Sequence, residues 1–321
     1  FPAGTVLLSS RAPIGKVAIA GVEMYCNQGF KNLICSEAIY NRYLYHYLKS
    51  KTDYLNSLGR GATFKEISKN IVESIEIPLP PINEQRKIAA VLDKVSDLIA
   101  KRRQQLDKLD ELVKSRFVEM FGDPIINSMH WMEELIGDSC FVTKLAGFEY
   151  TQYIHYGDSG DVVMVKAQNV KNGKLNRKDL SYISNEVSNS LPRSQLAAGD
   201  VVMTYVGANI GDVAVIDDEY KYHLAPNVAK IRPVAEKYNS VYFMYMLMFL
   251  NSYVVGNSAD TAKAALGMER IRKLKIFTPP IGLQEQFAAF VAQVDKSKFA
   301  IQKSLQKLKM LKSALMQEYF R

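Results

Sequence analysis

Lysine, arginine and amide side chains are frequent in the segments between predicted strands, where they could bind a nucleic acid. Such side chains contact phosphates and read the edges of bases. The candidates in the first part of the chain are Arg11, Lys31, Arg60, Thr63 and Lys65. The candidates in the second part are Lys144, Tyr153, Lys166, Gln168, Asn169, Lys171, Arg193, Tyr205, Asn209 and Lys263. The glycines at 59 and 61 would also let the backbone approach a phosphate closely. For each residue alone, a solvated surface role is the competing interpretation.

Catalytic patterns are not found in the sequence. The two Pro-Pro segments, at 79–82 and 278–281, lack the polar and aromatic neighbours of an adenine methyltransferase signature. Residues 14–17 (IGKV) lack the upstream glycine and the Ser or Thr of a phosphate-binding loop. The histidines, at 46, 130, 155 and 223, do not cluster in the sequence. We therefore expect no catalytic residues, no metal site and no bound cofactor.

Composition favours an anionic partner and a reducing compartment. The chain has 321 residues, a formal net charge of +8 and a pI of about 9.1. A basic surplus of this size attracts nucleic acids over long range. The three cysteines, Cys26, Cys35 and Cys140, form no Cys-x-x-Cys pair, so we expect reduced thiols and a cytoplasmic protein. The longest apolar run, 241–250, is too short to span a bilayer.

An internal repeat organises these residues. Residues 3–9 (AGTVLLS) lead into 14–19 (IGKVAI), and residues 198–204 (AGDVVMT) lead into 210–215 (IGDVAV). Both copies have the pattern of two strands around a loop that ends in Ile-Gly. We infer that the chain contains two copies of one folding unit.

Each copy continues with matching features. A turn containing asparagine, at 27–29 or 225–227, precedes a tyrosine-rich helical stretch at 43–48 or 242–247. Asn41 and Ser240 are the predicted N-caps of these helices. Each copy closes on a Pro-Pro pair, which marks the boundary of an element. The pair is followed by Glu84-Gln85 in the first copy and by Glu285-Gln286 in the second.

Two long helices are predicted after the Pro-Pro pairs. In the first, apolar residues recur in steps of three and four at 88, 91, 95, 98, 109 and 112, with 92, 99, 106 and 113 alongside. In the second, they recur at 287, 291, 294, 301, 305, 308 and 315, interrupted by Lys298 and Lys312. This heptad pattern is typical of a coiled coil. We predict an antiparallel pair, roughly 50 Å long, over the alternative that each helix folds back on its own domain.

The predicted fold class is α+β, with two mixed α/β recognition domains separated by these two helices. The expected boundaries are 1–82 for the first domain, 83–122 for the central helix, 123–282 for the second domain and 283–321 for the C-terminal helix. The second copy has a stretch before residue 198 with no counterpart before residue 3. We therefore expect the front part of the first domain to be missing.

The combined motifs resemble the specificity subunits of Type I restriction–modification systems. The matching segments are residues 9–15 (SSRAPIG), 27–32 (NQGFKN), 77–81 (IPLPP) with Glu84-Gln85, and 121–124 (FGDP). The resemblance covers nearly the whole chain. It implies a non-catalytic subunit that recognises a split sequence in double-stranded DNA.

The resemblance also implies partners. These are two modification subunits, which catalyse adenine methylation, and two restriction subunits, which perform DNA translocation and cleavage. S-adenosylmethionine, ATP and magnesium are then expected on those partners. Three other interpretations remain open from the residues: a coiled-coil scaffold without DNA binding, the recognition half of a fused restriction–methyltransferase, and a methyltransferase in its own right.

Overall fold

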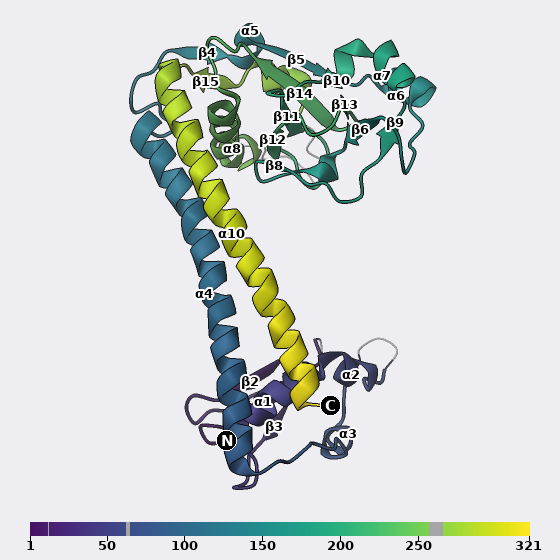
Figure 1. Ribbon diagram of the computed structural model, residues 1–321, viewed down its shortest axis with the longest axis vertical. Helices are drawn as coiled ribbons and strands as arrows, with labels where there is room; N and C mark the ends of the chain where they lie inside the picture. The colour runs from purple at the N-terminus through teal and green to yellow at the C-terminus, as the bar shows by residue number, and fades with distance from the viewer. Residues whose placement is uncertain (12, 62–64, 257–265) are drawn as a thin grey trace. The chain divides into compact units, whose positions relative to one another are not determined.

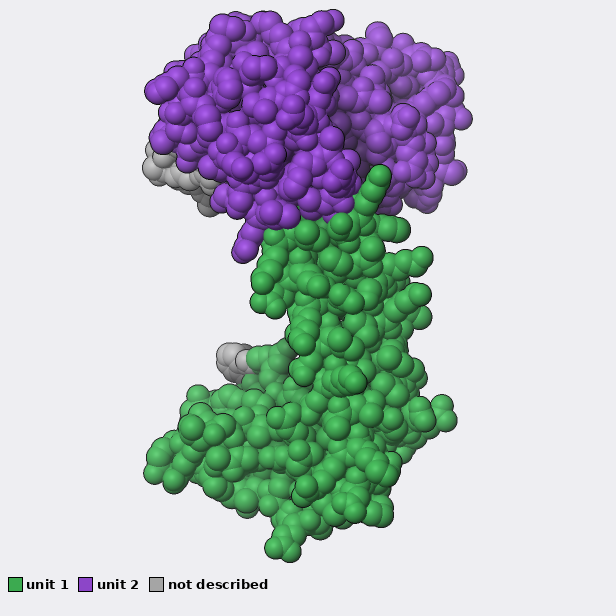
Figure 2. Space-filling model, turned by 60° about the vertical axis from the view of Figure 1, so that its left-hand side comes forward, with its two compact units in different colours: residues 1–109, 296–321 green, residues 110–295 purple. Residues whose placement is uncertain are grey.

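The computed structural model describes residues 1–11, 13–61, 65–256 and 266–321 (Figure 1). It divides into two compact units, which Figure 2 distinguishes by colour. Unit 1 contains residues 1–109 and 296–321, and unit 2 contains residues 110–295. Each of the two long helices contributes one end to each unit.

Unit 1 is built on a three-stranded antiparallel sheet of order β2-β1-β3. Its strands are β1 (Val6–Ser9), β2 (Val17–Ile19) and β3 (Phe30–Leu33), and its short helices are α1 (Asn41–Ser50), α2 (Thr52–Ser57) and α3 (Lys69–Glu73). The apolar side chains of β1 and of the tyrosine-rich α1 are buried together with Ile88 and Leu92. Burial of this apolar surface is the main force that holds the sheet against the helices.

Unit 2 repeats this sheet and adds a second four-stranded sheet and two small two-stranded sheets. The four-stranded sheet of order β12-β11-β14-β5 is joined by another of order β10-β13-β6-β9. The strands are β4 (Glu133–Leu135), β5 (Cys140–Lys144), β6 (Val162–Val165), β7 (Val170–Lys171), β8 (Lys174–Leu175), β9 (Tyr182–Ile183), β10 (Gln195–Leu196), β11 (Val201–Thr204), β12 (Val213–Val215), β13 (Tyr222–Leu224), β14 (Val228–Pro233) and β15 (Lys275–Phe277). The helices are α5 (Ile136–Ser139), α6 (Gly147–Tyr153), η1 (Ala167–Asn169), α7 (Asn185–Ser190), η2 (Pro192–Ser194), α8 (Ser240–Gly256) and α9 (Met268–Arg272).

The predicted repeat is confirmed by strand register. In unit 1, Val6 pairs with Ile19 on one side and with Leu33 on the other. In unit 2, Val201 pairs with Val215 and with Ile231 in the same antiparallel sense. The sheet β2-β1-β3 therefore corresponds strand for strand to β12-β11-β14.

The two long helices pack together and run antiparallel. They are α4 (Ile82–Phe121) and α10 (Ile281–Tyr319), and each begins directly after a Pro-Pro pair. In unit 1, Lys312 of α10 donates to the Ser96 hydroxyl of α4 at 2.6 Å. In unit 2, the rings of Phe117 and Phe287 pack edge to face, with their centroids 5.4 Å apart. As residue numbers increase along α4, the numbers of their partners on α10 decrease, so the two helices are antiparallel. This confirms the predicted fold class.

The buried stripe of α4 differs in part from the prediction. Ile88, Leu92, Val95, Ile99 and Val113 are buried, as expected for residues on the packed face. Val91, Leu98 and Leu112 were predicted in the seam, but they are 40%, 38% and 46% exposed. The buried residues follow one another in steps of three, four and fourteen, and the exposed residues in steps of seven and fourteen. Both sets fit a heptad repeat, so sequence spacing alone could not decide which stripe faces α10.

Two further local predictions are wrong. Asn41 and Ser240 are the first residues of their helices, and their side chains donate to the carbonyls of Gly4 and Gly199. The cap of α8 is Asn239, whose side-chain oxygen accepts from the Val241 amide at 2.9 Å. The side chains of Asn41 and Ser240 instead form hydrogen bonds that connect each helix to the segment just before the central strand of its sheet.

The counterpart of Gln85 is Gln284, and the predicted match with Gln286 is off by two positions. Gln85 and Gln284 are fully buried. Each accepts a hydrogen bond from the backbone amide just before the tyrosine-rich helix of its unit. Gln286 is exposed. The Glu-Gln pair of α10 lies two residues further from its Pro-Pro pair than the Glu-Gln pair of α4 does, so matching the two pairs by sequence gave the wrong equivalence.

Candidate nucleic-acid interface

The hairpin loop that carries several candidate residues has the same backbone in both units. Gly15 and Gly211 have φ values of 85° and 84°, a conformation that favours glycine. The Gly15 amide donates to the Ser9 carbonyl at 3.0 Å, and the Gly211 amide donates to the Thr204 carbonyl at 2.8 Å. The Ile-Gly motif of the repeat therefore marks a turn that requires glycine.

Ser10 and Tyr205 occupy equivalent positions beside this loop. The Ser10 amide donates to Gly29, and its carbonyl accepts from Ile67, at 2.8 and 2.9 Å. The Tyr205 amide donates to Asn227, and its carbonyl accepts from Leu266, at 2.9 and 2.8 Å. A later segment of each unit thus returns to the end of the central strand.

Unit 1 gathers most of its predicted contact residues at this place. A pocket of about 610 Å³ is lined by Ser9, Arg11, Pro13, Lys16, Asn27, Gly29, Phe30 and Glu66. Glu66 forms backbone bridges with Arg11 and Arg60, and Lys65 precedes it in the chain. Arg11, Lys31, Arg60 and Lys65 are therefore brought together, while Thr63 lies outside the described residues.

Lys31 lies next to this pocket, where it contacts Ser10 and Glu66. Its amine donates to the Ser10 hydroxyl at 3.3 Å and lies 3.5 Å from Oε1 of Glu66. Arg11, Arg60 and Lys65 are exposed, so their charges remain available to a ligand. Sequence reasoning missed Lys16 and Glu66. Lys16 follows the Ile-Gly turn and could have been recognised, whereas Glu66 reaches the pocket only through long-range backbone pairing.

Unit 2 brings Lys144, Arg193 and Tyr205 into one region. Lys144 and Arg193 line a pocket of about 500 Å³ together with Thr143, Ala146, Gly267, Met268, Glu269 and Arg272. The Lys144 amine lies over the Tyr205 ring, 5.4 Å from its centroid. Arg272 was not predicted, because it belongs to α9, which is far from the other lining residues in sequence.

A lysine amine lies against the same repeat position in both units, although the two lysines come from different strands. Lys31 on β3 corresponds to Ala229 on β14, since they pair with Leu8 and Met203 in the two registers. Lys144 on β5 is the cross-strand partner of Ala229. Directly paired residues share a face of a sheet. Lys31 and Lys144 therefore present positive charge on equivalent faces.

Arg193 is held by a buried lysine. Lys230 is 2% exposed, and its amine donates to the carbonyls of Arg193 and Gln195, both at 2.7 Å. Burial lowers the pKa of Lys230. The Arg193 guanidinium donates to both carboxylate oxygens of Glu149, at 3.1 and 3.2 Å. The position of Arg193 is thus fixed from its backbone as well as its side chain.

The remaining predicted residues of unit 2 do not form one cluster with Lys144. The Lys166 amine donates to the Asp179 carbonyl and the Ser181 hydroxyl. Asn169 is buried, and its amide donates to two backbone carbonyls, so it is a structural residue of its loop. Tyr153, Gln168, Lys171 and Asn209 are exposed, and Lys263 lies outside the described residues.

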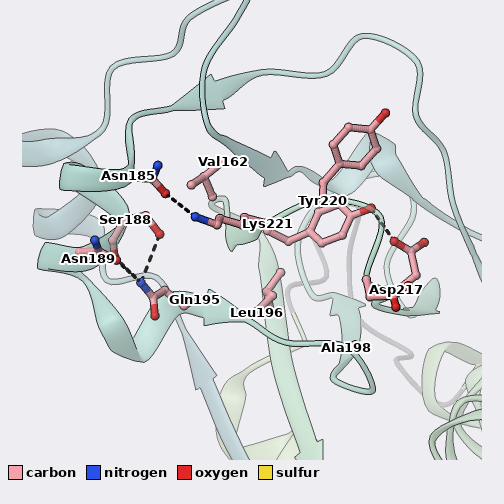
Figure 3. Close-up of a pocket in the computed structure, with 12 residues that line it drawn as sticks. Val162, Asn185, Ser188, Asn189, Gln195, Leu196, Ala198, Asp217, Tyr220 and Lys221 are labelled. Atoms are coloured by element: carbon pink, nitrogen blue, oxygen red, sulfur yellow. Dashed lines mark hydrogen bonds between the residues drawn. The ribbon is translucent and has the colours of Figure 1, made fainter.

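A separate pocket of about 700 Å³ in unit 2 contains none of the predicted contact residues (Figure 3). Its polar side chains bind one another: Lys221 donates to the Asn185 oxygen at 3.2 Å, and Gln195 donates to the Asn189 oxygen at 3.0 Å. The Tyr222 hydroxyl donates to Asp217 at 2.7 Å. This pocket has a mixed charge and lacks the concentrated positive charge of the two regions above.

The described residues contain neither a cluster of metal ligands nor a helix that could span a membrane. Across residues 1–11, 13–61, 65–256 and 266–321, no group of three or more His, Cys, Asp or Glu side chains could hold a metal ion. Within those same ranges, no helix has the length and apolar character needed to cross a bilayer.

The fold of this chain is similar to that of S subunits of Type I restriction–modification systems. The S subunit from M. genitalium aligns over 100% of this chain and 83% of its own length, with a TM-score of 0.61 and 16% identity. A chain from a study of complex assembly and conformational transition in the type I R-M system aligns over 100% and 82%, with a TM-score of 0.61 and 20% identity.

Sequence comparison identifies the family. The model of the Type I restriction modification DNA specificity domain matches residues 1–111 and 141–312, so this chain belongs to that family. The MjaIX specificity subunit of Methanocaldococcus jannaschii is 28% identical over 98% of this chain and 76% of its own length. The EcoBI specificity subunit of Escherichia coli is 22% identical over 88% and 64%. The resemblance seen in the motifs is therefore confirmed.

Proposed function

We propose that this chain is the non-catalytic DNA specificity subunit of a Type I restriction–modification complex, and that its two units read the two parts of a split DNA target. The observation that carries the proposal is the repeated placement of positive charge. In each unit a lysine amine lies against the equivalent position, Ser10 or Tyr205, at the end of the central strand.

The chemistry of these regions suits duplex DNA. Exposed Arg11, Arg60 and Lys65 would supply charge for phosphates in unit 1. Lys144 would supply it in unit 2, beside Arg193 and Arg272, whose guanidinium groups pair with Glu149 and Glu269. Glu66 lines the pocket of unit 1 and Thr143 lines the pocket of unit 2. Both are polar groups of the kind that read base edges. Since the two units share a scaffold but differ in these side chains, each would recognise a different short sequence.

The partners proposed from the family are two modification subunits and two restriction subunits. S-adenosylmethionine, ATP and magnesium would bind to those partners, and the complex would act in the cytoplasm. Exposed apolar residues on the long helices support a docking role. In unit 1, Val91 and Leu98 of α4 and Met310 and Leu311 of α10 are 38% to 66% exposed. Exposed apolar residues at heptad spacing favour packing against further helices.

Methylation mapping tests the proposed function directly. Cells that carry this chain with its cognate modification subunit should show adenine methylation at one split, asymmetric motif, and cells without the chain should show none. Methylation that persists without this chain would contradict the proposal. A complex that assembles but methylates no defined motif would favour the scaffold interpretation. Activity of the chain alone with S-adenosylmethionine would favour a methyltransferase or a fused enzyme.

A further inference from the structure

Glu66 is a carboxylate placed among the cations of the unit 1 pocket. It lines the pocket with Arg11 and Lys16, and its side chain is 44% exposed. Lys31 approaches its Oε1 at 3.5 Å, which is longer than a well-formed hydrogen bond. A carboxylate can accept about four hydrogen bonds. Glu66 therefore retains acceptor capacity toward the pocket.

The backbone of Glu66 is held firmly. Its amide and carbonyl exchange hydrogen bonds with Arg60, both at 3.0 Å. The next residue, Ile67, is fully buried and donates its amide to the Ser10 carbonyl at 2.9 Å. A side chain on such a support presents its carboxylate in a defined place, which is what recognition of a single base requires.

A carboxylate here disfavours a purely phosphate-binding pocket. A negative charge beside Lys31 and Arg11 weakens the attraction of the pocket for a phosphate. The carboxylate is instead matched to a hydrogen-bond donor. In the major groove the donors on base edges are the exocyclic amino groups, N4 of cytosine and N6 of adenine.

We propose that Glu66 is a specificity-determining residue of unit 1, which accepts a hydrogen bond from the exocyclic amino group of one cytosine or adenine in the major groove. Lys31 is its positioning residue, and Arg11 and Arg60 hold the flanking phosphates. This inference rests on the proposed function. It goes further by assigning one base contact to one side chain.

The test is methylation mapping of the complete modification complex with Glu66→Ala, Glu66→Gln and the control Glu73→Gln. Glu73 is an exposed glutamate of α3 in the same unit, 3.5 Å from Lys69, so its substitution removes the same charge. Glu66→Ala should relax the motif at one base pair of one half-site. Discrimination at that position should fall about 5- to 150-fold, the span expected for one mismatched base pair. The other half-site should be unchanged.

Glu66→Gln distinguishes the two bases. An amide can pair with both N6 and N7 of adenine, whereas only its oxygen can accept from the amino group of cytosine. If wild type reads cytosine, the variant should shift its preference toward adenine; if wild type reads adenine, that preference should persist while Glu66→Ala loses it. An unchanged motif in both Glu66 variants, or a uniform loss of methylation at every site, overturns the inference but not the proposed function. Absence of a split motif in wild type and Glu73→Gln overturns both.

Discussion

Gln85 and Gln284 make the same three hydrogen bonds in the two units. Each side-chain oxygen accepts from a backbone amide at the start of the tyrosine-rich helix, and each side-chain nitrogen donates to two backbone carbonyls. All six distances lie between 2.8 and 2.9 Å. One of the two carbonyls in each case belongs to the first proline of the Pro-Pro pair. This glutamine therefore joins the start of a long helix to the sheet-and-helix part of its unit.

Replacing either glutamine with leucine should destabilise its unit. The substitution leaves one amide and two carbonyls without their partner, and each unsatisfied buried group costs about 1–3 kcal/mol. We expect a loss of about 2–5 kcal/mol in the free energy of unfolding. Trp131, the single tryptophan of the chain, donates its indole N–H to Phe121 and reports on unit 2. Denaturant titration followed by Trp131 fluorescence should show the loss for Gln284→Leu.

Gln286→Leu is the matched control, because Gln286 is exposed and two residues further along the same helix. It should change the unfolding midpoint only slightly. An equal loss of stability in Gln286→Leu and Gln284→Leu would contradict the structural equivalence of Gln85 and Gln284.

A buried histidine that pairs with an aspartate in unit 1 should make the free energy of unfolding depend on pH. His46 is fully buried on α1, and its Nε2 lies 2.8 Å from Oδ1 of Asp93 on α4. Burial lowers the pKa of His46, outweighing the attraction of Asp93, and Lys312 of α10 and Lys49 of α1 lower it further. Burial alone would raise the pKa of Asp93, but hydrogen bonds from Arg42 and His46 together lower it.

Both shifts have the same consequence on acidification. The unfolded chain takes up a proton at His46 near its ordinary pKa of 6.5, while the folded chain resists it until a lower pH. The stabilising effect is thus complete above pH 6.5 and decreases as the pH falls below it. We expect the unfolding free energy of wild type to fall between pH 7.5 and 5.5, and to fall less steeply in His46→Gln. Urea titrations followed by circular dichroism measure this slope.

His223 must be considered in the same experiment, since it is buried in unit 2 and burial lowers its pKa as well. His223→Gln should flatten a separate part of the dependence, visible in Trp131 fluorescence. The exposed His130 supplies the control. Were His130→Gln to flatten the slope as much as His46→Gln, burial of His46 would not be its cause.

Much of the scaffold could be predicted because local chemistry dictates it. The turn at Gly15 requires a positive φ, and the Pro-Pro pair marks the boundary of an element, so both left a clear pattern in the sequence. The face of α4 could not be chosen, because Val91 and Leu92 both continue heptad patterns. Which stripe is buried depends on the partner helix, and that information is not local.

The candidate interface shows the same division. Arg11 and Lys31 were predicted because basic residues lay close to a recognisable turn. Glu66 and Arg272 were missed, since each reaches its pocket through pairing with residues distant in sequence. Asn169 was predicted to contact DNA from its residue type, but its side-chain amide donates to backbone carbonyls of its own loop. Residue type indicates capacity for a contact, and only the fold shows whether that capacity is free.

Loss of Arg60 should weaken DNA binding without altering assembly. Arg60 is exposed, and its backbone rather than its side chain is paired with Glu66. If its guanidinium contacts a phosphate, Arg60→Ala should lower affinity for all sequences similarly and reduce the salt slope by about one. Filter binding or fluorescence anisotropy of the assembled methyltransferase at several salt concentrations measures both quantities.

Two variants make this result specific. Lys87→Ala removes one exposed charge from α4, outside the pocket, and should leave the salt slope unchanged. Lys166→Ala, by contrast, breaks hydrogen bonds to Asp179 and Ser181 and should lower stability along with any change in binding. Normal affinity of Arg60→Ala at moderate salt would remove Arg60 from the interface.

The exposed apolar stripe of α4 should be needed for binding of the modification subunit. Leu98 is 38% exposed, one heptad after Val91, so both present apolar surface on one side of the helix within unit 1. Leu98→Asp should abolish or strongly reduce copurification of the modification subunit, because a carboxylate would be buried in an apolar helix contact. Its circular dichroism should match wild type, since Leu98 lies outside the buried face formed by Leu92, Val95 and Ile99.

The control for Leu98→Asp is Ala100→Asp, which adds the same charge at an exposed position on another side of α4. If charge alone weakened the complex, both variants would lose the modification subunit in parallel. If apolar burial drives docking, Ala100→Asp should retain it while Leu98→Asp and Val91→Asp lose it. Retention of the modification subunit by both stripe variants would mean that docking uses another surface, and the exposed leucine and valine would then need a different partner.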